Sequence, residues 1–138
     1  MSNKKLNKVF IHQPDFAPWM TFFKRLDKSD IYVILDDVQF NRRGFTNRDY
    51  ILLNKKKTLL TIPVIKTERE KTLIKDVKID YKINWLEKMK KSLYLNYSKS
   101  VNFNEIYEFI GKTFEKKDEK LMNLNLEIIY YVIEKLKI

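Results

Sequence analysis

Two short stretches of the chain contain side chains that could do acid–base and anion-binding chemistry. The first, FIHQPDFAPWM at residues 10–20, holds the single histidine, His12, and two of the three prolines. The second, ILDDVQFNRRGFTNRDYI at residues 34–51, holds Asp36, Asp37 and three arginines. An imidazole beside a carboxylate can act as a general base, because the carboxylate fixes the tautomer and stabilises the imidazolium that forms. The two stretches therefore predict an active site if the fold brings them together.

Other interpretations of His12, Asp36 and Asp37 stay open at this point. The histidine could simply cap the end of a strand, and aspartates often terminate strands by turning the chain. One imidazole and two carboxylates could also bind zinc, manganese or iron, but so small a set is not specific, and we predict no metal and no cofactor. With no cysteine, no G-x-S-x-G motif and only two glycines, the sequence offers no thiolate, no serine elbow and no phosphate-binding glycine loop.

Arginine is concentrated in the second stretch, whereas lysine supplies most positive charge elsewhere. Only five of the 28 Lys and Arg residues are arginines, and Arg42, Arg43 and Arg48 lie within seven residues. The planar guanidinium group suits bidentate contacts with phosphate or carboxylate. The alternative is that these arginines brace the loop by pairing with its own carboxylates. Gln39 and Asn47 add amides that could bind sugar hydroxyls or an acyl carbonyl, and Trp19 could form an apolar wall.

The elements expected around these stretches would place them at one edge of a sheet. Residues 8–12 and 31–35 are short and β-prone, and the second run is apolar enough for a strand buried on both faces. Between them, residues 18–30 open with a proline and place apolar side chains at helical spacing. This β-α-β pattern predicts two parallel neighbouring strands, so that His12, Asp36 and Asp37 follow carboxyl ends that face the same crevice.

The rest of the chain predicts a hairpin, one more strand and about three helices. YILL and TLLTIPVI flank NKKK as a hairpin, and LIKDVKID at 73–80 alternates like a strand. Apolar stripes at helical spacing begin at Trp85, Phe103 and Met122. We therefore expect a single α/β domain, 1–138, with a β-α-β unit and hairpin in a mixed-sheet part at 1–80 and a helical part at 81–138.

Composition narrows the class of protein further. The hydrophobic fraction of 44% is typical of a globular protein, and no apolar run is long enough to span a membrane. The absence of cysteine makes the cytoplasm the expected location. The net charge of +10 raises nucleic-acid binding as an alternative function, although no recognition motif accompanies the charge.

The two stretches together resemble the WbqC-like protein family of bacterial surface-polysaccharide gene clusters. The resemblance rests on the order and spacing of His-Gln-Pro, Pro-Trp, Asp-Asp-Val-Gln-Phe and Asn-Arg, followed by a strand ending LTIPV. It extends through the hairpin and the Trp85 helix and so covers most of the chain. Family members usually continue beyond the third helix, so the resemblance implies that this chain is shortened at its C-terminal end.

The resemblance implies a transferase that acylates the amine of a nucleotide-linked deoxyamino sugar, in some cases with glycine. His12 would deprotonate the amine, Asp36 or Asp37 would orient it, and Arg43 and Arg48 would bind a phosphate-bearing substrate. The expected partners are a nucleotide sugar and an acyl or aminoacyl donor, which could be a charged tRNA. A non-catalytic nucleotide-sugar-binding or scaffold protein is the alternative. The candidate catalytic residues are His12, Asp36 and Asp37, and the candidate substrate-binding residues are Gln13, Trp19, Gln39, Arg43, Asn47 and Arg48.

Overall fold

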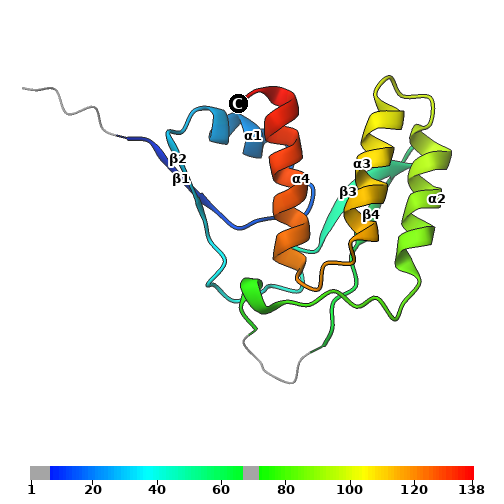
Figure 1. Cartoon of the computed structure of the whole chain (residues 1–138), viewed down its shortest axis with the longest axis horizontal. Coiled ribbons are helices and arrows are strands. Elements are labelled where there is room, and N and C mark those ends of the chain that lie inside the picture. Colours follow the sequence, from blue (N-terminus) through cyan, green and yellow to red (C-terminus); the bar gives the residue numbers. More distant parts are fainter. Residues whose placement is uncertain (1–6, 67–71) are drawn as a thin grey trace, which may run out of the picture.

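The N-terminal part of the chain is the expected β-α-β unit. The structure, a computed structural model, describes residues 7–66 and 72–138 (Figure 1). Strand β1 (Val9–His12) leads into helix α1 (Met20–Asp27) and then strand β2 (Ile31–Ile34). The two strands are parallel, with Val9 beside Ile31 and His12 beside Ile34. Both strands therefore end at the same edge, as predicted.

The predicted hairpin is also present, as a second sheet separate from β1–β2. Strand β3 (Arg48–Leu53) pairs antiparallel with strand β4 (Lys56–Thr61). Asn54 and Lys55 form the two-residue turn, and both have positive φ angles, 50° and 61°. Tight turns of this kind need positive φ at both positions because their backbone twist then matches that of the strands. The α/β class is thus confirmed, with two small sheets among the described residues instead of one mixed sheet.

The strand predicted at 73–80 is wrong. Ile74–Asp76 form a short 3-10 helix, and only isolated bridges follow it, such as Val64 to Ile79. The backbone bonds to the loop after β2 instead, with Ile74 N donating to Val38 O and Lys75 N donating to Asp36 O. Ile74 and Val77 are both buried in this conformation, so the apolar pattern is satisfied without a ladder.

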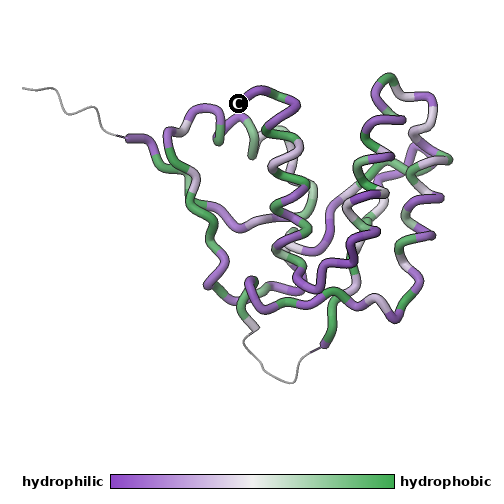
Figure 2. Tube along the Cα trace, in the orientation of Figure 1, coloured by the Kyte–Doolittle hydropathy of each residue, from purple (hydrophilic) through white to green (hydrophobic). Residues whose placement is uncertain are grey.

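Three helices complete the fold, and α4 lies between the β-α-β unit and the α2–α3 pair (Figure 1). They are α2 (Trp85–Tyr97), α3 (Phe103–Glu115) and α4 (Leu121–Leu136). Apolar and polar residues alternate along each of them (Figure 2). One apolar cluster joins the helices to the hairpin, and a smaller one packs Phe22 and Phe23 of α1 against Ile129 of α4. The main cluster contains Phe16, Ile62, Val77, Ile79, Trp85, Met89, Phe114, Leu121 and Leu124.

The β1–β2 sheet is covered on one face only, which differs from the expectation for residues 31–35. Phe10 and Tyr32 pack on the α1–α4 cluster, whereas Ile31 and Val33 are 44% and 40% exposed. An apolar run in a strand does not by itself show how many layers cover it.

No helix in the described part of the chain is long and apolar enough to cross a membrane.

Candidate active site

The HQPD segment turns the chain sharply after β1 and holds it against the loop that precedes β3. Asp15 N donates to Gln13 O at 2.9 Å, and Phe16 N donates to Phe45 O at 3.0 Å. Ala17 follows with φ of 44°, a conformation that non-glycine residues rarely adopt. The turn places the side chains of His12 and Asp15 on the same side, where they face the start of α1.

A cavity of about 220 Å³ opens at this point between β1, α1 and the loop before β3. Its wall combines aromatic rings with an imidazole, two carboxylates and a guanidinium group. The lining residues are Phe10, His12, Asp15, Pro18, Trp19, Thr21, Phe22, Arg25, Phe45 and Asp49. We treat this cavity as the candidate active site.

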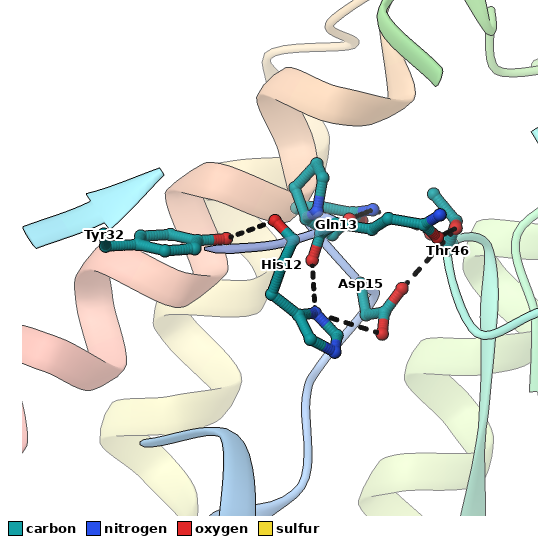
Figure 3. Close-up of polar contacts among 7 residues, drawn as sticks. His12, Gln13, Asp15, Tyr32 and Thr46 are labelled. Carbon is teal, nitrogen blue, oxygen red and sulfur yellow. Dashed lines mark hydrogen bonds and ion pairs between the residues drawn. The ribbon is translucent and has the colours of Figure 1, made fainter. Parts of the chain in front are cut away.

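The hydrogen bond of His12 fixes which nitrogen can act as a base. Its Nδ1 lies 2.9 Å from the carbonyl oxygen of Gln13 and 3.8 Å from Oδ2 of Asp15 (Figure 3). A carbonyl oxygen only accepts hydrogen bonds, so Nδ1 must carry the proton. The lone pair of the neutral ring is therefore on Nε2, which lies on the side of the ring away from the Gln13 oxygen (Figure 3). Phe10 stacks on the ring and Phe22 meets it edge-on, which hold its orientation.

Asp15 is the carboxylate that lies beside His12, and its environment disfavours the charged form. Burial raises the pKa of Asp15, while His12 and a hydrogen bond from Thr46 lower it and the nearby Asp49 raises it further. The Thr46 hydroxyl lies 3.5 Å from both Asp15 Oδ1 and Gln13 Oε1, so its proton is shared between weak partners. A positive charge on His12 or on a bound ligand would stabilise the ionised Asp15 carboxylate.

Asp49 supplies a second carboxylate from the start of β3. The residue is only 5% exposed, and its Oδ1 accepts hydrogen bonds from Trp19 Nε1 at 2.7 Å and from Tyr50 N at 2.6 Å. Its Oδ2 accepts no hydrogen bond from any other residue of the described chain. This oxygen is thus the acceptor that Asp49 offers to a ligand in the cavity.

Asn125 of α4 clamps the two segments that build the site. Its Nδ2 donates to Pro14 O and to Thr46 O, both at 2.7 Å, and the residue is fully buried. Pro14 belongs to the turn after His12, and Thr46 belongs to the loop before β3. The amide must face this way, because the flipped form would place an oxygen against two carbonyls. Helix α4 therefore fixes the distance between the two parts of the cavity.

The structure brings His12 and Trp19 into the cavity but not Asp36 and Asp37. Leu35 N still donates to His12 O, so the parallel ladder runs one residue past β2. The chain then leaves the sheet, because Asp36 O accepts from Lys75 N of the 3-10 helix. Neither aspartate lines the cavity. The catalytic roles suggested for His12, Asp36 and Asp37 stay predictions, but the carboxylate within 4 Å of His12 is Asp15.

The candidate binding residues divide between this cavity and the surrounding loop. Gln13 contacts Thr46 behind His12, and Arg48 Nε donates to Gly44 O at 3.1 Å, which braces the loop. Asn47 is buried and donates to Ile62 O, and it faces a separate cavity of about 180 Å³. Gln39 and Arg43 are exposed, outside both cavities. Their substrate-binding roles also stay predictions.

Four residues of the site or its frame were missed at the sequence level: Asp15, Arg25, Asp49 and Asn125. Asp15 had a local signal, since it follows His12 by three residues in a proline turn. Asn125 had another, because it interrupts the apolar face of α4 between Leu121 and Ile129. The sequence around Arg25 and Asp49 gave no signal that would single out either residue. In the described part of the chain, no three His, Asp or Glu side chains are grouped to hold a metal ion.

Fold and site together define a small α/β protein with a histidine–carboxylate cavity at the carboxyl end of a β-α-β unit. Residues 13–138 match the WbqC-like protein family, and the chain belongs to that family. It is similar to the uncharacterized protein Rv1507c of Mycobacterium tuberculosis, with 28% identity over 125 residues. That match covers 90% of this chain and 54% of the relative, so the chain spans about half of the relative's length. No solved structure matches the chain.

Proposed function

We propose that the protein transfers an acyl or aminoacyl group to the amine of a nucleotide-linked deoxyamino sugar in the synthesis of a bacterial surface polysaccharide. Membership of the WbqC-like family supports the pathway, and the cavity supports the chemistry. We place the reaction in the cytoplasm, since activated sugars are made there. The observation that carries the proposal is the free Nε2 of His12 in a cavity that also contains Asp15 and Asp49.

The two carboxylates favour an amine as the acceptor. An amino sugar is largely protonated near neutral pH, and its ammonium group would be attracted to Asp15 and to the open Oδ2 of Asp49. His12 Nε2 then removes a proton to give the neutral amine. The ring becomes doubly protonated, and the ionised Asp15 carboxylate at 3.8 Å stabilises that charge.

The neutral amine attacks the carbonyl carbon of the donor, which forms the new C–N bond. His12 first releases its extra proton to solvent, which frees Nε2 again. The tetrahedral intermediate then collapses as the bond between the carbonyl carbon and the leaving group breaks, and the second proton of the amine passes through Nε2 to the leaving group. Arg25, on the α1 side of the cavity, is the cationic side chain placed to bind an anionic part of a substrate. The transfer step itself is redox-neutral.

The proposal is tested by mixing the protein with a thymidine diphosphate 4-amino-4,6-dideoxyhexose and three kinds of donor. These are acyl thioesters, free acids with ATP, and aminoacylated tRNA. We expect a mass gain equal to one acyl group, lost in His12→Gln and retained in the matched control Lys24→Gln, an exposed residue of α1 outside the cavity. Sugar binding without product from any donor would instead support a non-catalytic nucleotide-sugar-binding protein.

A further inference from the structure

A second cavity, of about 300 Å³, lies on the other side of Trp19 and Asp49. Helices α2, α3 and α4 and the hairpin supply its walls, which are almost entirely apolar. Its side chains include Leu60 of β4, Met89 of α2, Ile110 and Phe114 of α3, and Ile128 and Val132 of α4. Phe109 and Tyr131 also line it, and their rings stack with centroids 3.7 Å apart across α3 and α4.

The two cavities share a wall at Trp19 and Asp49, which line both of them. Asp49 is the one charged residue in the lining of the second cavity, and its Oδ2 accepts no hydrogen bond from the described residues. A molecule whose reacting carbon lies next to Asp49 could therefore extend an apolar group into the second cavity. The amine held in the first cavity would meet that carbon at the shared wall.

We infer that the second cavity takes an apolar acyl group of the donor, a straight chain of more than two carbons, and that the transferred group is such a chain in preference to glycyl. This inference rests on the proposed function, because it names the donor class for the same site. A space of about 300 Å³ equals the liquid volume of roughly ten water molecules, so a two-carbon group would leave most of it unfilled. Burial of each additional methylene group in an apolar lining increases the binding affinity, whereas a glycyl group has little apolar surface to bury.

The test uses neutral primary amides, which present the product's functional group and a chain of chosen length. Acetamide, butanamide, hexanamide and octanamide are titrated calorimetrically into the full chain. We expect affinity to rise about fourfold for each added methylene from acetamide to hexanamide, and to level off at the chain length that fills the cavity. Equal affinity for acetamide and hexanamide would overturn the inference.

Substitutions in the lining test whether the amides bind in this cavity. Val132→Phe adds bulk to its lining and should flatten the chain-length series. Val101→Phe makes the same change at an exposed position outside the cavity and should leave the series intact. Ile106→Trp, at a lining residue that is partly open to solvent, is the second filling variant if Val132→Phe does not fold. A steep series retained in a folded filling variant would also overturn the inference.

The binding series needs no catalysis, so it separates this inference from the proposed function. A steep series in a protein that forms no amide product would support the apolar cavity and count against the transferase. Transfer of glycyl and acetyl groups together with a flat series would support the transferase and overturn the acyl cavity. His12→Gln serves as an internal check, because it should abolish transfer and leave the amide series unchanged.

Discussion

Trp19 and Asp49, 30 residues apart in the sequence, are joined by a 2.7 Å hydrogen bond from the indole Nε1 to the carboxylate Oδ1. The bond ties the entry to α1 to the start of β3. It also aligns a buried carboxylate that lines both cavities and whose second oxygen accepts no hydrogen bond from the described residues. Lys57 lies over the Trp19 and Tyr50 rings, with Nζ 5.7 and 4.1 Å from their centroids.

Trp19→Phe should destabilise the protein by about 1–3 kcal/mol, because a buried carboxylate loses a donor. Loss of apolar burial contributes little, since Trp19 is 56% exposed. The measurement is urea unfolding of Trp19→Phe, Asp49→Asn and the double variant. The two changes should be non-additive, with a smaller cost of Trp19→Phe when residue 49 is neutral. Simple additivity would show that the bond contributes nothing to stability.

Asn125→Leu should cost about 2–5 kcal/mol, because it leaves the carbonyls of Pro14 and Thr46 without a donor in the protein interior. Asn123→Leu on the same helix is the matched control, since Asn123 is exposed and bonds only to Asp118. Urea unfolding measures both. Amide exchange should also accelerate in the loop before β3 for Asn125→Leu alone. Equal costs for the two variants would contradict the clamp.

Parts of the structure with a local signal in the sequence were predictable, and parts that depend on distant contacts were not. His12 and Trp19 stood out because their types are rare in this chain and chemically distinctive. The β-α-β unit and the three helices followed from local periodicity, which survives folding. The buried Asp49 accepts a hydrogen bond from an indole 30 positions away, and that contact leaves no trace in the neighbouring residues.

The position of Asp36 and Asp37 outside the cavity has a similar cause. Topology correctly placed the end of β2 beside the end of β1, but Asp36 bonds through its backbone to a segment whose 3-10 turn was predicted as a strand. The path of the chain after a strand is decided by such distant partners. Asp15 reaches His12 through a tight turn, and that geometry became clear only with the backbone in place.

The pH dependence of stability should report the environment of Asp15. Burial raises its pKa in the folded state above the ordinary value of 3.8, so between these two values the folded state binds more protons than the unfolded state. The free energy of unfolding contributed by this group therefore falls as the pH rises through that window. Asp15→Asn cannot ionise and so avoids the cost of a buried charge. Its stability relative to the natural protein should improve from about pH 4 upward and then level off.

The measurement is urea unfolding of both proteins across that pH range. Asp37→Asn removes an exposed carboxylate outside the cavity and corrects for the general change in net charge. A stability difference for Asp15→Asn that moves in the opposite direction would show that Asp15 gains more from His12 and Thr46 than it loses by burial.

The transferase assay can decide which carboxylate works with His12. Asp15→Asn leaves the Gln13 carbonyl in place, so the Nδ1–H tautomer is kept, but the negative charge 3.8 Å from Nδ1 is lost. The imidazolium that forms when His12 takes the proton then lacks its counter-ion, so the rate of amide formation should fall by about 10- to 1000-fold. KM should rise as well, because the charge of Asp15 also attracts the ammonium group of the acceptor. Asp36→Asn and Asp37→Asn should keep near-natural rates, since neither lines the cavity. A large loss in Asp36→Asn and none in Asp15→Asn would restore the pairing expected from strand topology, and would mean that substrate binding draws the loop after β2 toward His12.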